Sequence, residues 1–430
     1  MFKSLELADI KILKEIESER IQIAELDDVS RWIDLAISSI PEFKKYQDSL
    51  LKIEEYFEES GLEGDDLHLW RAYKNLFAQR FSGIYDDVLQ VTDVIAHDLF
   101  KYFATHTRLK EARSRYSRGT IPLTFLGKSE DYYITYTHDM EHPIAVISIP
   151  QGRVSSVWNW LAIPHEIGHN IFAHYIDFES ELWGKINRLL QKGRFRINLL
   201  DFSSKISGKK IMQTIWRFWL DELVADVFGV LFTGPAFVMS RHSDSVQAAE
   251  EMGGIDLAIW NLDEMEMSRH PTASIRPLLG SKMLRILGFE DIGDELDERW
   301  FEICRQYSST GDLLWVNETP DGVKKLFTIP IDEMLRSFDI IIPEILTGSL
   351  KCLGGESLMN IIRFDNLDFV ISRVVADELI NGIDEFARYV KPRHLLSATR
   401  LAFESHPDQA DLIHSSAMKG LIYYKNNHSD

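Results

Sequence analysis

The hydrophobic pattern of the chain changes twice, and these changes constrain its architecture more than any other feature. Up to about residue 117, apolar residues recur at three- and four-residue steps, the period of an amphipathic helix. The helical period returns after Gly152 and persists to the end, with loops expected at Ser240–Gly254, Ser308–Gly322 and Gly348–Glu356. Between these helical parts lie three short segments rich in β-branched and aromatic residues, IPLTFLG, DYYITYTHD and PIAVISIP. We therefore expect a mostly α protein of the α+β class with one small antiparallel sheet.

The length of 430 residues is too great for a single hydrophobic core. The changes in pattern predict three parts: an acidic helical unit at residues 1–117, a core at 118–290 and a second helical unit at 291–430. The first 66 residues alone carry 18 acidic and 8 basic side chains. We expect this acidic surface to be solvated, and the alternative is that it binds a protein partner.

The charge balance of the chain excludes some classes of partner. The formal net charge is −20, from 47 basic and 67 acidic side chains, whereas a general nucleic-acid binder needs a basic surface. The same excess argues against docking on an anionic membrane. The charge reverses between Lys185 and Arg217, which contain nine basic residues and one acidic residue, Asp201. A solvated loop between helices is the expected explanation of this reversal.

The two cysteines and the apolar stretches indicate the compartment. Cys304 and Cys352 are too few for a disulfide framework or a Cys-rich zinc site. The N-terminus has no apolar signal segment. The most apolar long stretch, Leu223–Met239, is short for a membrane-spanning helix and contains Asp226. We therefore expect a soluble, cytoplasmic protein without a transmembrane segment.

One segment has the residue spacing of a metal site. In WNWLAIPHEIGHNIFAHY, the residues His165, Glu166 and His169 form an HExxH motif. Four residues turn a helix by about 400°, so both imidazoles lie on one face and can bind the same Zn²⁺ ion. Glu166 points to the side where a zinc-activated water would sit, as the general base of a hydrolysis. Because of Pro164, this helix must either kink or begin near that residue.

Zinc needs a third protein ligand, and two schemes compete for it. In metzincin-like proteases the motif extends to HExxHxxGxxH. Here Phe172 occupies the Gly position and Tyr175 the position of the third His. His174 lies about 140° round the helix from His169 and cannot reach the same ion. This scheme is therefore excluded.

The second scheme takes a Glu ligand from a later helix. In FWLDELVADVFGVLF, Glu222 and Asp226 lie four residues apart in an otherwise apolar stretch, where acidic side chains need partners. We expect Glu222 to bind the metal and Asp226 to accept a hydrogen bond from Nδ1–H of a ligand histidine. Asp221 is expected nearer solvent, because its face differs from that of Glu222 by about 100°.

The HExxH motif followed by Glu222 and Asp226 resembles the gluzincin superfamily of zinc metallopeptidases, and the resemblance implies a zincin-like catalytic core with an active-site helix. His270, a proline and Arg276 form an HPxxxxR string. It resembles the segment downstream of the zinc Glu in the CAAX-prenyl-endopeptidase-like and HtpX-like branch. That resemblance implies that His270 and Arg276 stabilise the oxyanion or position the substrate. The resemblance covers about residues 118–290. The chain differs from the membrane members of that branch, which carry transmembrane helices.

Together these motifs predict a zinc-dependent peptidase with one zinc ion per chain and a peptide or protein substrate. The strand PIAVISIP is expected to be the sheet edge that pairs with the extended peptide. Two alternatives stay open. One is an interaction or regulatory protein with a latent or structural zinc site, and the other is a zinc hydrolase of a non-peptide amide or ester.

Overall fold

The computed structural model describes residues 28–38, 44, 46–61, 65–107, 109, 112, 122–128, 132–135, 144–200, 207–252, 257–261, 266–307, 312–319 and 322–428. The chain divides into two compact units. The first comprises Met1–Asp93 and Arg115–Gln151, and the second comprises Val94–Ser114 and Gly152–Asp430. A unit boundary thus falls within the segment 118–290, directly after the strand-forming residues.

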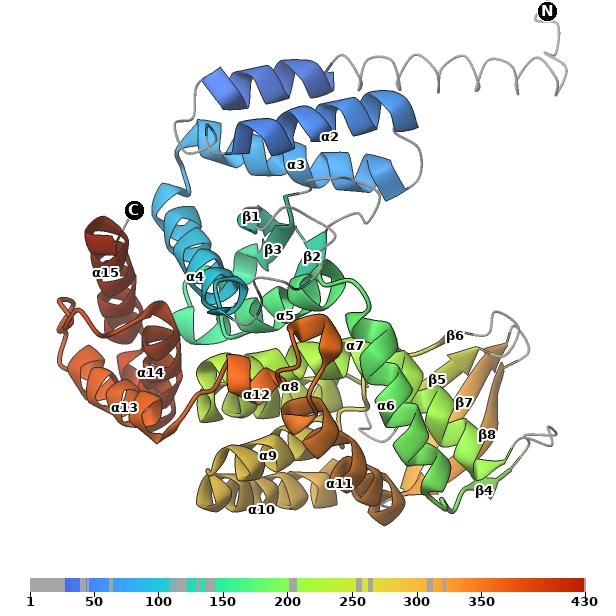
Figure 1. The fold of residues 1–430 in the computed structure, drawn as a ribbon. Coiled ribbons are helices and arrows are strands. Elements are labelled where there is room, and N and C mark those ends of the chain that lie inside the picture. The colour runs from blue at the N-terminus through green and yellow to red at the C-terminus, as the bar shows by residue number, and fades with distance from the viewer. Residues whose placement is uncertain are drawn as a thin grey trace, which may run out of the picture. The chain divides into compact units, whose positions relative to one another are not determined.

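Helices with a shared aromatic core build the first unit. Residues 28–38 are helical, and α2 (Gln47–Ser60), α3 (Asp65–Ser82) and the start of α4 (Asp86–Ala104) follow (Figure 1). Phe57 of α2 packs edge-on against Trp70 and Tyr73 of α3, with ring centroids 5.8 and 6.2 Å apart. The helical character expected here is confirmed, while the expected helical pattern of residues 1–27 lies outside the described residues.

A three-stranded sheet completes the first unit, with its strands where the sequence predicts them. The strands are β1 (Leu123–Gly127), β2 (Tyr133–Thr135) and β3 (Val146–Pro150), in the order β1-β3-β2. The expectation of an antiparallel sheet is wrong in part, because β1 and β3 pair in parallel while β2 and β3 are antiparallel. Every residue of β1 and β3 is buried, as suits a parallel pair with both faces covered.

The strand β3, which contains most of PIAVISIP, is the central strand of this sheet. The expectation that it forms an edge for an extended peptide is therefore wrong, since both of its sides are already paired. Side chains from α3 satisfy the outer side of β1. The Gln79 amide exchanges two hydrogen bonds of 2.7 Å with the Leu126 backbone, and Arg80 donates to the Thr124 carbonyl at 2.8 Å. Covering an edge in this way prevents further strands from adding to it.

The second unit is built around α7, which is buried at every residue from Glu222 to Thr233. Its other long helices are α5 (Ala162–His174), α6 (Phe178–Lys192), α8 (Pro235–Met252), α9 (Arg276–Leu287), α10 (Glu290–Tyr307), α11 (Ile331–Thr347), α13 (Asn366–Ile380), α14 (Pro392–Ser405) and α15 (Ala410–His428). A five-stranded sheet has the order β4-β8-β7-β5-β6 (Figure 1). Its strands are β4 (Asn198–Leu199), β5 (Leu257–Asn261), β6 (Glu266–Met267), β7 (Asp312–Thr319) and β8 (Gly322–Pro330).

Two of the segments expected to be loops, Ser240–Gly254 and Ser308–Gly322, contain regular secondary structure. The expectation that the chain is helical from residue 290 onwards is wrong for the β7–β8 hairpin. The segment Ser240–Gly254 is largely helical, because α8 continues to Met252. The segment Ser308–Gly322 contains β7, which pairs antiparallel with β8 and buries Leu313 and Trp315. In both cases tertiary packing overrides a polar, turn-forming local composition.

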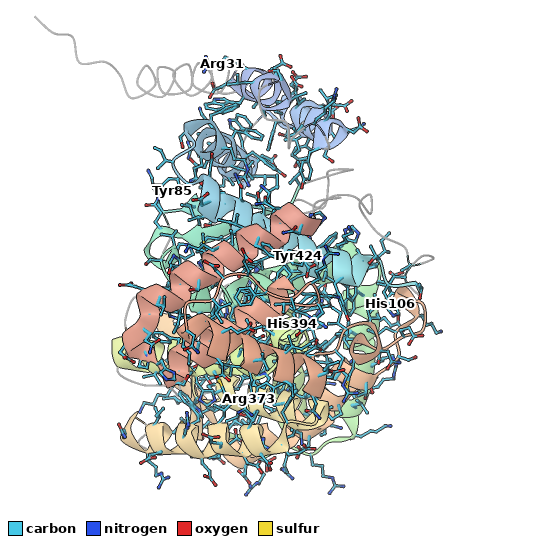
Figure 2. The ribbon with its side chains drawn as sticks, turned by 90° about the vertical axis from the view of Figure 1, so that its left-hand side faces the viewer. Arg31, Tyr85, His106, Arg373, His394 and Tyr424 are labelled. Atoms are coloured by element: carbon cyan, nitrogen blue, oxygen red, sulfur yellow. The ribbon has the colours of Figure 1, made fainter. Side chains whose placement is uncertain are left out.

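The C-terminal helices join through a buried carboxylate. Asp368 at the start of α13 accepts a hydrogen bond from Arg393 of α14 at 2.6 Å and lies 2.7 Å from Nε2 of His394. These helices face the viewer in Figure 2, where Arg373, His394 and Tyr424 mark α13, α14 and α15. No described helix combines the length and the apolar character that crossing a bilayer requires.

Candidate metal centre

The HExxH motif lies on α5, which begins at Ala162. Pro164 therefore falls in the first turn, where no backbone N–H is needed for the helix, and the helix continues without a break to His174. His165 and His169 project from the same face one turn apart. Their Nε2 atoms are 3.1 Å apart and their rings are perpendicular.

A glycine inside the motif sets the distance between α5 and α7. A Cβ atom placed on Gly168 would lie 2.8 Å from the Ala225 Cα and 2.8 Å from the Phe228 Cβ. Both distances are shorter than side chains tolerate, so only a glycine permits this approach of the two backbones. The histidines on either side of Gly168 are thereby brought against the acidic residues of α7.

Glu222 of α7 completes a triangle of possible ligand atoms. One of its carboxylate oxygens lies 3.5 Å from Nε2 of His165, and the other lies 3.5 Å from Nε2 of His169. Ligand atoms of a tetrahedral zinc ion, at about 2.0–2.2 Å from the metal, are about 3.3–3.5 Å apart. All three residues are buried, and this group could hold a metal ion.

Each histidine ring is backed by a carboxylate. Nδ1 of His165 lies 2.9 Å from Asp226, and Nδ1 of His169 lies 3.1 Å from Asp221. Burial opposes a positive charge on His169, but Asp221 and Glu222 raise the pKa of its imidazole well above the usual value, so this cluster favours a positive charge beside the carboxylates. A metal ion would supply that charge, and two imidazoles with one carboxylate are donors that zinc accepts, so the donor set fits a metal ion.

Asp221 is the residue of this centre that the sequence argument missed. Its side chain is 54% exposed, as expected from its face of α7, yet it reaches the imidazole of His169. The antiparallel course of α5 and α7 explains the contact. If Asp226 faces His165, then His169, one turn later on α5, must face a residue about one turn earlier on α7, and both Asp221 and Glu222 are there.

Arg276, the first residue of α9, lies against the acids of α7. Its Nε and one terminal nitrogen donate to the two Asp226 oxygens at 2.7 and 2.8 Å, and the same terminal nitrogen lies 3.2 Å from Glu222. His270 is 65% exposed, with its Nδ1 2.8 Å from Glu222. The structure thus brings both ends of the HPxxxxR string to the possible zinc ligand.

The electrostatics keep the carboxylates charged. Burial opposes the charge of Glu222, but three neighbouring imidazoles, chiefly that of His165, hold the pKa of this carboxyl far below its usual range. Burial likewise opposes the charge of Asp226, and the Arg276 guanidinium holds the Asp226 pKa below its usual range. The same acids raise the pKa of Arg276 in spite of its burial. Both carboxylates are therefore ionised at neutral pH, which a metal ligand and its support require.

Glu166 is buried on α5 next to His165, as the motif demands. Of the sequence-derived group, His165, His169, Glu222 and Asp226 meet where α5 and α7 pack together. No family model, curated protein or solved structure matches the chain. The chemistry of the centre is therefore inferred from its own side chains.

Proposed function

We propose that the chain is a zinc-dependent peptidase in which His165, His169 and Glu222 hold one zinc ion and Glu166 is the general base. The observation that carries the proposal is the pair of Nε2 atoms 3.1 Å apart, with the buried Glu222 carboxylate closing the triangle. Two histidines and one glutamate form the protein ligand set of many hydrolytic zinc sites, which keep a further position for water or substrate.

The residues around the metal site have different roles in the proposed hydrolysis. A bound zinc ion supplies a Lewis acid that polarises a carbonyl group and acidifies a water molecule. Glu166 accepts the proton of that water and passes it to the leaving amine nitrogen, so that water is added across the C–N bond. Asp226 and Asp221 lie beside Nδ1 of His165 and His169 and orient the two rings.

The residues of the HPxxxxR string take different parts in this proposal. The partly buried guanidinium of Arg276 holds Glu222 and Asp226 in place, so Arg276 acts on the substrate only through them. His270 is exposed at the same carboxylate, and its imidazole is the group that can donate to the substrate oxygen as that oxygen becomes negative.

The test compares zinc content and hydrolysis in two variants. Glu166→Gln is expected to keep one zinc ion per chain and to lose about 10²- to 10⁴-fold in the hydrolysis of a fluorescence-quenched peptide pool. Glu222→Ala is expected to lose the zinc itself. Glu302→Gln, an exposed change on α10, serves as the matched control. Undiminished hydrolysis by Glu166→Gln would exclude it as the base, and full zinc content in Glu222→Ala would exclude that residue as a ligand.

The burial of all three ligand residues also suits a structural zinc site in an interaction or regulatory protein. Under that alternative the zinc-loaded protein cleaves nothing in the peptide pool, while Glu222→Ala still loses the metal and much of its stability. A third possibility, hydrolysis of a non-peptide amide or ester, predicts turnover of small acyl substrates and none of the peptides.

A further inference from the structure

A basic surface surrounds strand β4, in a chain whose net charge is −20. Part of the basic segment Lys185–Arg217 is neutralised within the fold, since Arg196 lies 2.6 Å from Asp332 and 2.5 Å from Glu333. Six other basic side chains on neighbouring segments are exposed and form no ion pair with any residue that the structure describes: Lys192, Arg194, Lys209, Lys210, Lys324 and Lys325. The expectation of a solvated loop does not explain why charge of one sign collects here.

The segments that carry these side chains meet at β4. Leu199 of β4 is paired with Phe327 of β8, and the Leu200 amide donates to the Leu326 carbonyl at 2.9 Å. At the other end, a Cβ atom placed on Gly208 would lie 2.8 Å from the Phe195 carbonyl oxygen, so the start of α7 touches the residues before β4. Figure 1 shows β4 against β8 at the margin of the sheet. Successive strand residues such as Lys324 and Lys325 point to opposite faces of the sheet, so the bases flank the β4–β8 edge of the sheet on both sides.

Three large apolar side chains are exposed among these bases. They are Leu199 at 47%, Leu200 at 51% and Val323 at 65% exposure, the last next to Lys324 at the turn end of β8. We call these three residues and the six bases the β4 patch. Neither the packing of the sheet nor the metal centre accounts for apolar side chains in this position, because each of them faces water.

The first turn of α7 adds to the positive potential. Lys209 and Lys210 follow the N-cap Ser207, whose side chain accepts from the Lys210 amide at 3.3 Å. The N-terminal end of a helix carries a partial positive charge, so two lysines there are electrostatically unfavourable for the helix itself. An anionic group in front of this turn removes the repulsion.

We propose that the β4 patch docks the second unit on an anionic phospholipid surface. Its lysines and arginine are attracted to the lipid phosphate and carboxylate groups, and Leu199, Leu200 and Val323 enter the interfacial layer. A nucleic acid would use the bases alone and leave these aliphatic side chains in water. The net charge of −20 argues against docking of the chain as a whole on an anionic membrane, so docking is confined to the β4 patch, where the charge is reversed. The proposal is independent of the peptidase activity.

The test is sedimentation of the full chain with vesicles. Vesicles of phosphatidylcholine containing about a third phosphatidylserine are expected to bind the protein at 0.1 M salt, and pure phosphatidylcholine vesicles are not, since each lysine gains about 1 kcal/mol only at a negative surface. Lys324→Glu with Lys325→Glu is expected to lower binding about 30-fold or more. Leu200→Ser with Val323→Ser keeps the charge and is expected to weaken binding at every salt concentration.

The matched control is Lys351→Glu with Arg373→Glu, which changes the net charge equally at exposed positions outside the β4 patch. It is expected to bind as the unaltered protein does, and the far-ultraviolet spectra of all variants check their folding. Equal loss in the control would overturn the proposal, as would absence of binding to the anionic vesicles. Binding to poly-glutamate without binding to vesicles would also overturn it, in favour of an acidic polypeptide partner.

Discussion

Gly168 of α5 lies against the backbone of Ala225 of α7 with no room for a side chain: a Cβ atom there would be 2.8 Å from the Ala225 Cα. The contact falls between the two histidines of the HExxH motif and one turn from Glu222. The geometry of the possible metal site is thus coupled to a close backbone contact between its two helices.

Replacing Gly168 with Ala is expected to destabilise the protein by about 1–3 kcal/mol, because the added methyl forces α5 and α7 apart. The same movement separates the histidines from Glu222, so zinc affinity is expected to fall as well. Urea unfolding and zinc titration measure the two effects. Gly184→Ala on α6 is the control. A Cβ there meets only the end of Arg188 at 4.0 Å, so this change is expected to be neutral or stabilising by up to about 1 kcal/mol. Equal behaviour of the two variants would contradict the prediction.

The two carboxylates behind the histidines are expected to differ in what they stabilise. Asp226→Ala leaves the partly buried Arg276 without its main partner and is expected to cost about 3 kcal/mol as well as zinc affinity. Asp221→Ala removes a half-exposed side chain and is expected to lower zinc affinity about 10- to 100-fold while changing stability by about 0.5 kcal/mol or less. Unaltered zinc binding by Asp221→Ala would show that its contact with His169 does not orient the ligand.

Removal of the metal is expected to lower the melting temperature of the second unit. A ligand present at about 1,000 times its Kd stabilises the folded state by about 4 kcal/mol, which corresponds to about 6 °C for a unit of this size. Calorimetry with and without a chelator measures the shift, and added zinc should restore it. Glu222→Ala is the control and is expected to melt at the same temperature in both conditions. A chelator without effect on the unaltered protein would contradict a bound ion.

Buried His242 on α8 is expected to make the fold sensitive to mild acid. Burial, followed by the charges of Arg299 and Arg400, lowers the pKa of His242 to about 4. Because the unfolded chain takes up this proton near its ordinary pKa of about 6.5 and the folded chain does not, stability is full above that value. It falls as the pH drops towards 4, by about 2 kcal/mol between pH 7 and pH 5.

The measurement for His242 is urea unfolding at the two pH values, compared with His242→Leu. The Nε2 atom is buried and has no hydrogen-bond partner among the described residues, so an apolar replacement breaks no hydrogen bond at that atom. The variant is expected to lose about 2 kcal/mol less than the unaltered protein on acidification. An identical pH dependence in both proteins would rule out His242 as the source.

Local sequence pattern located most elements around the centre, because helical and strand periods are properties of neighbouring residues. The helices α3, α4, α5 and α7 and the three strands of the first unit lie where the pattern predicts. The direction of strand pairing could not be predicted from the local pattern, because the parallel alignment of β1 with β3 depends on what covers their two faces. The β7–β8 hairpin was also missed, although the Pro-Asp-Gly sequence before β8 is a turn signal between two runs of apolar residues.

The part of the candidate centre that lies on α5 and α7 could be predicted from the sequence. The spacings of His165 with His169 and of Glu222 with Asp226 each place a pair on one helical face, so packing α5 on α7 brings them together. The contact of Asp221 required knowing that these helices run antiparallel. The buried position of Arg276 required knowing where α9 begins, and no local spacing contains that information.

The position of Arg276 between Glu222 and Asp226 also affects the charge of the centre. Asp221, Glu222 and Asp226 on α7, with Glu166 on α5, bring four carboxylates to one part of the second unit, and Arg276 supplies one compensating positive charge. The remaining excess of negative charge favours a cation of more than one positive charge over a monovalent ion. One arginine at the start of α9 thus limits the excess negative charge that an ion bound between these two helices has to neutralise.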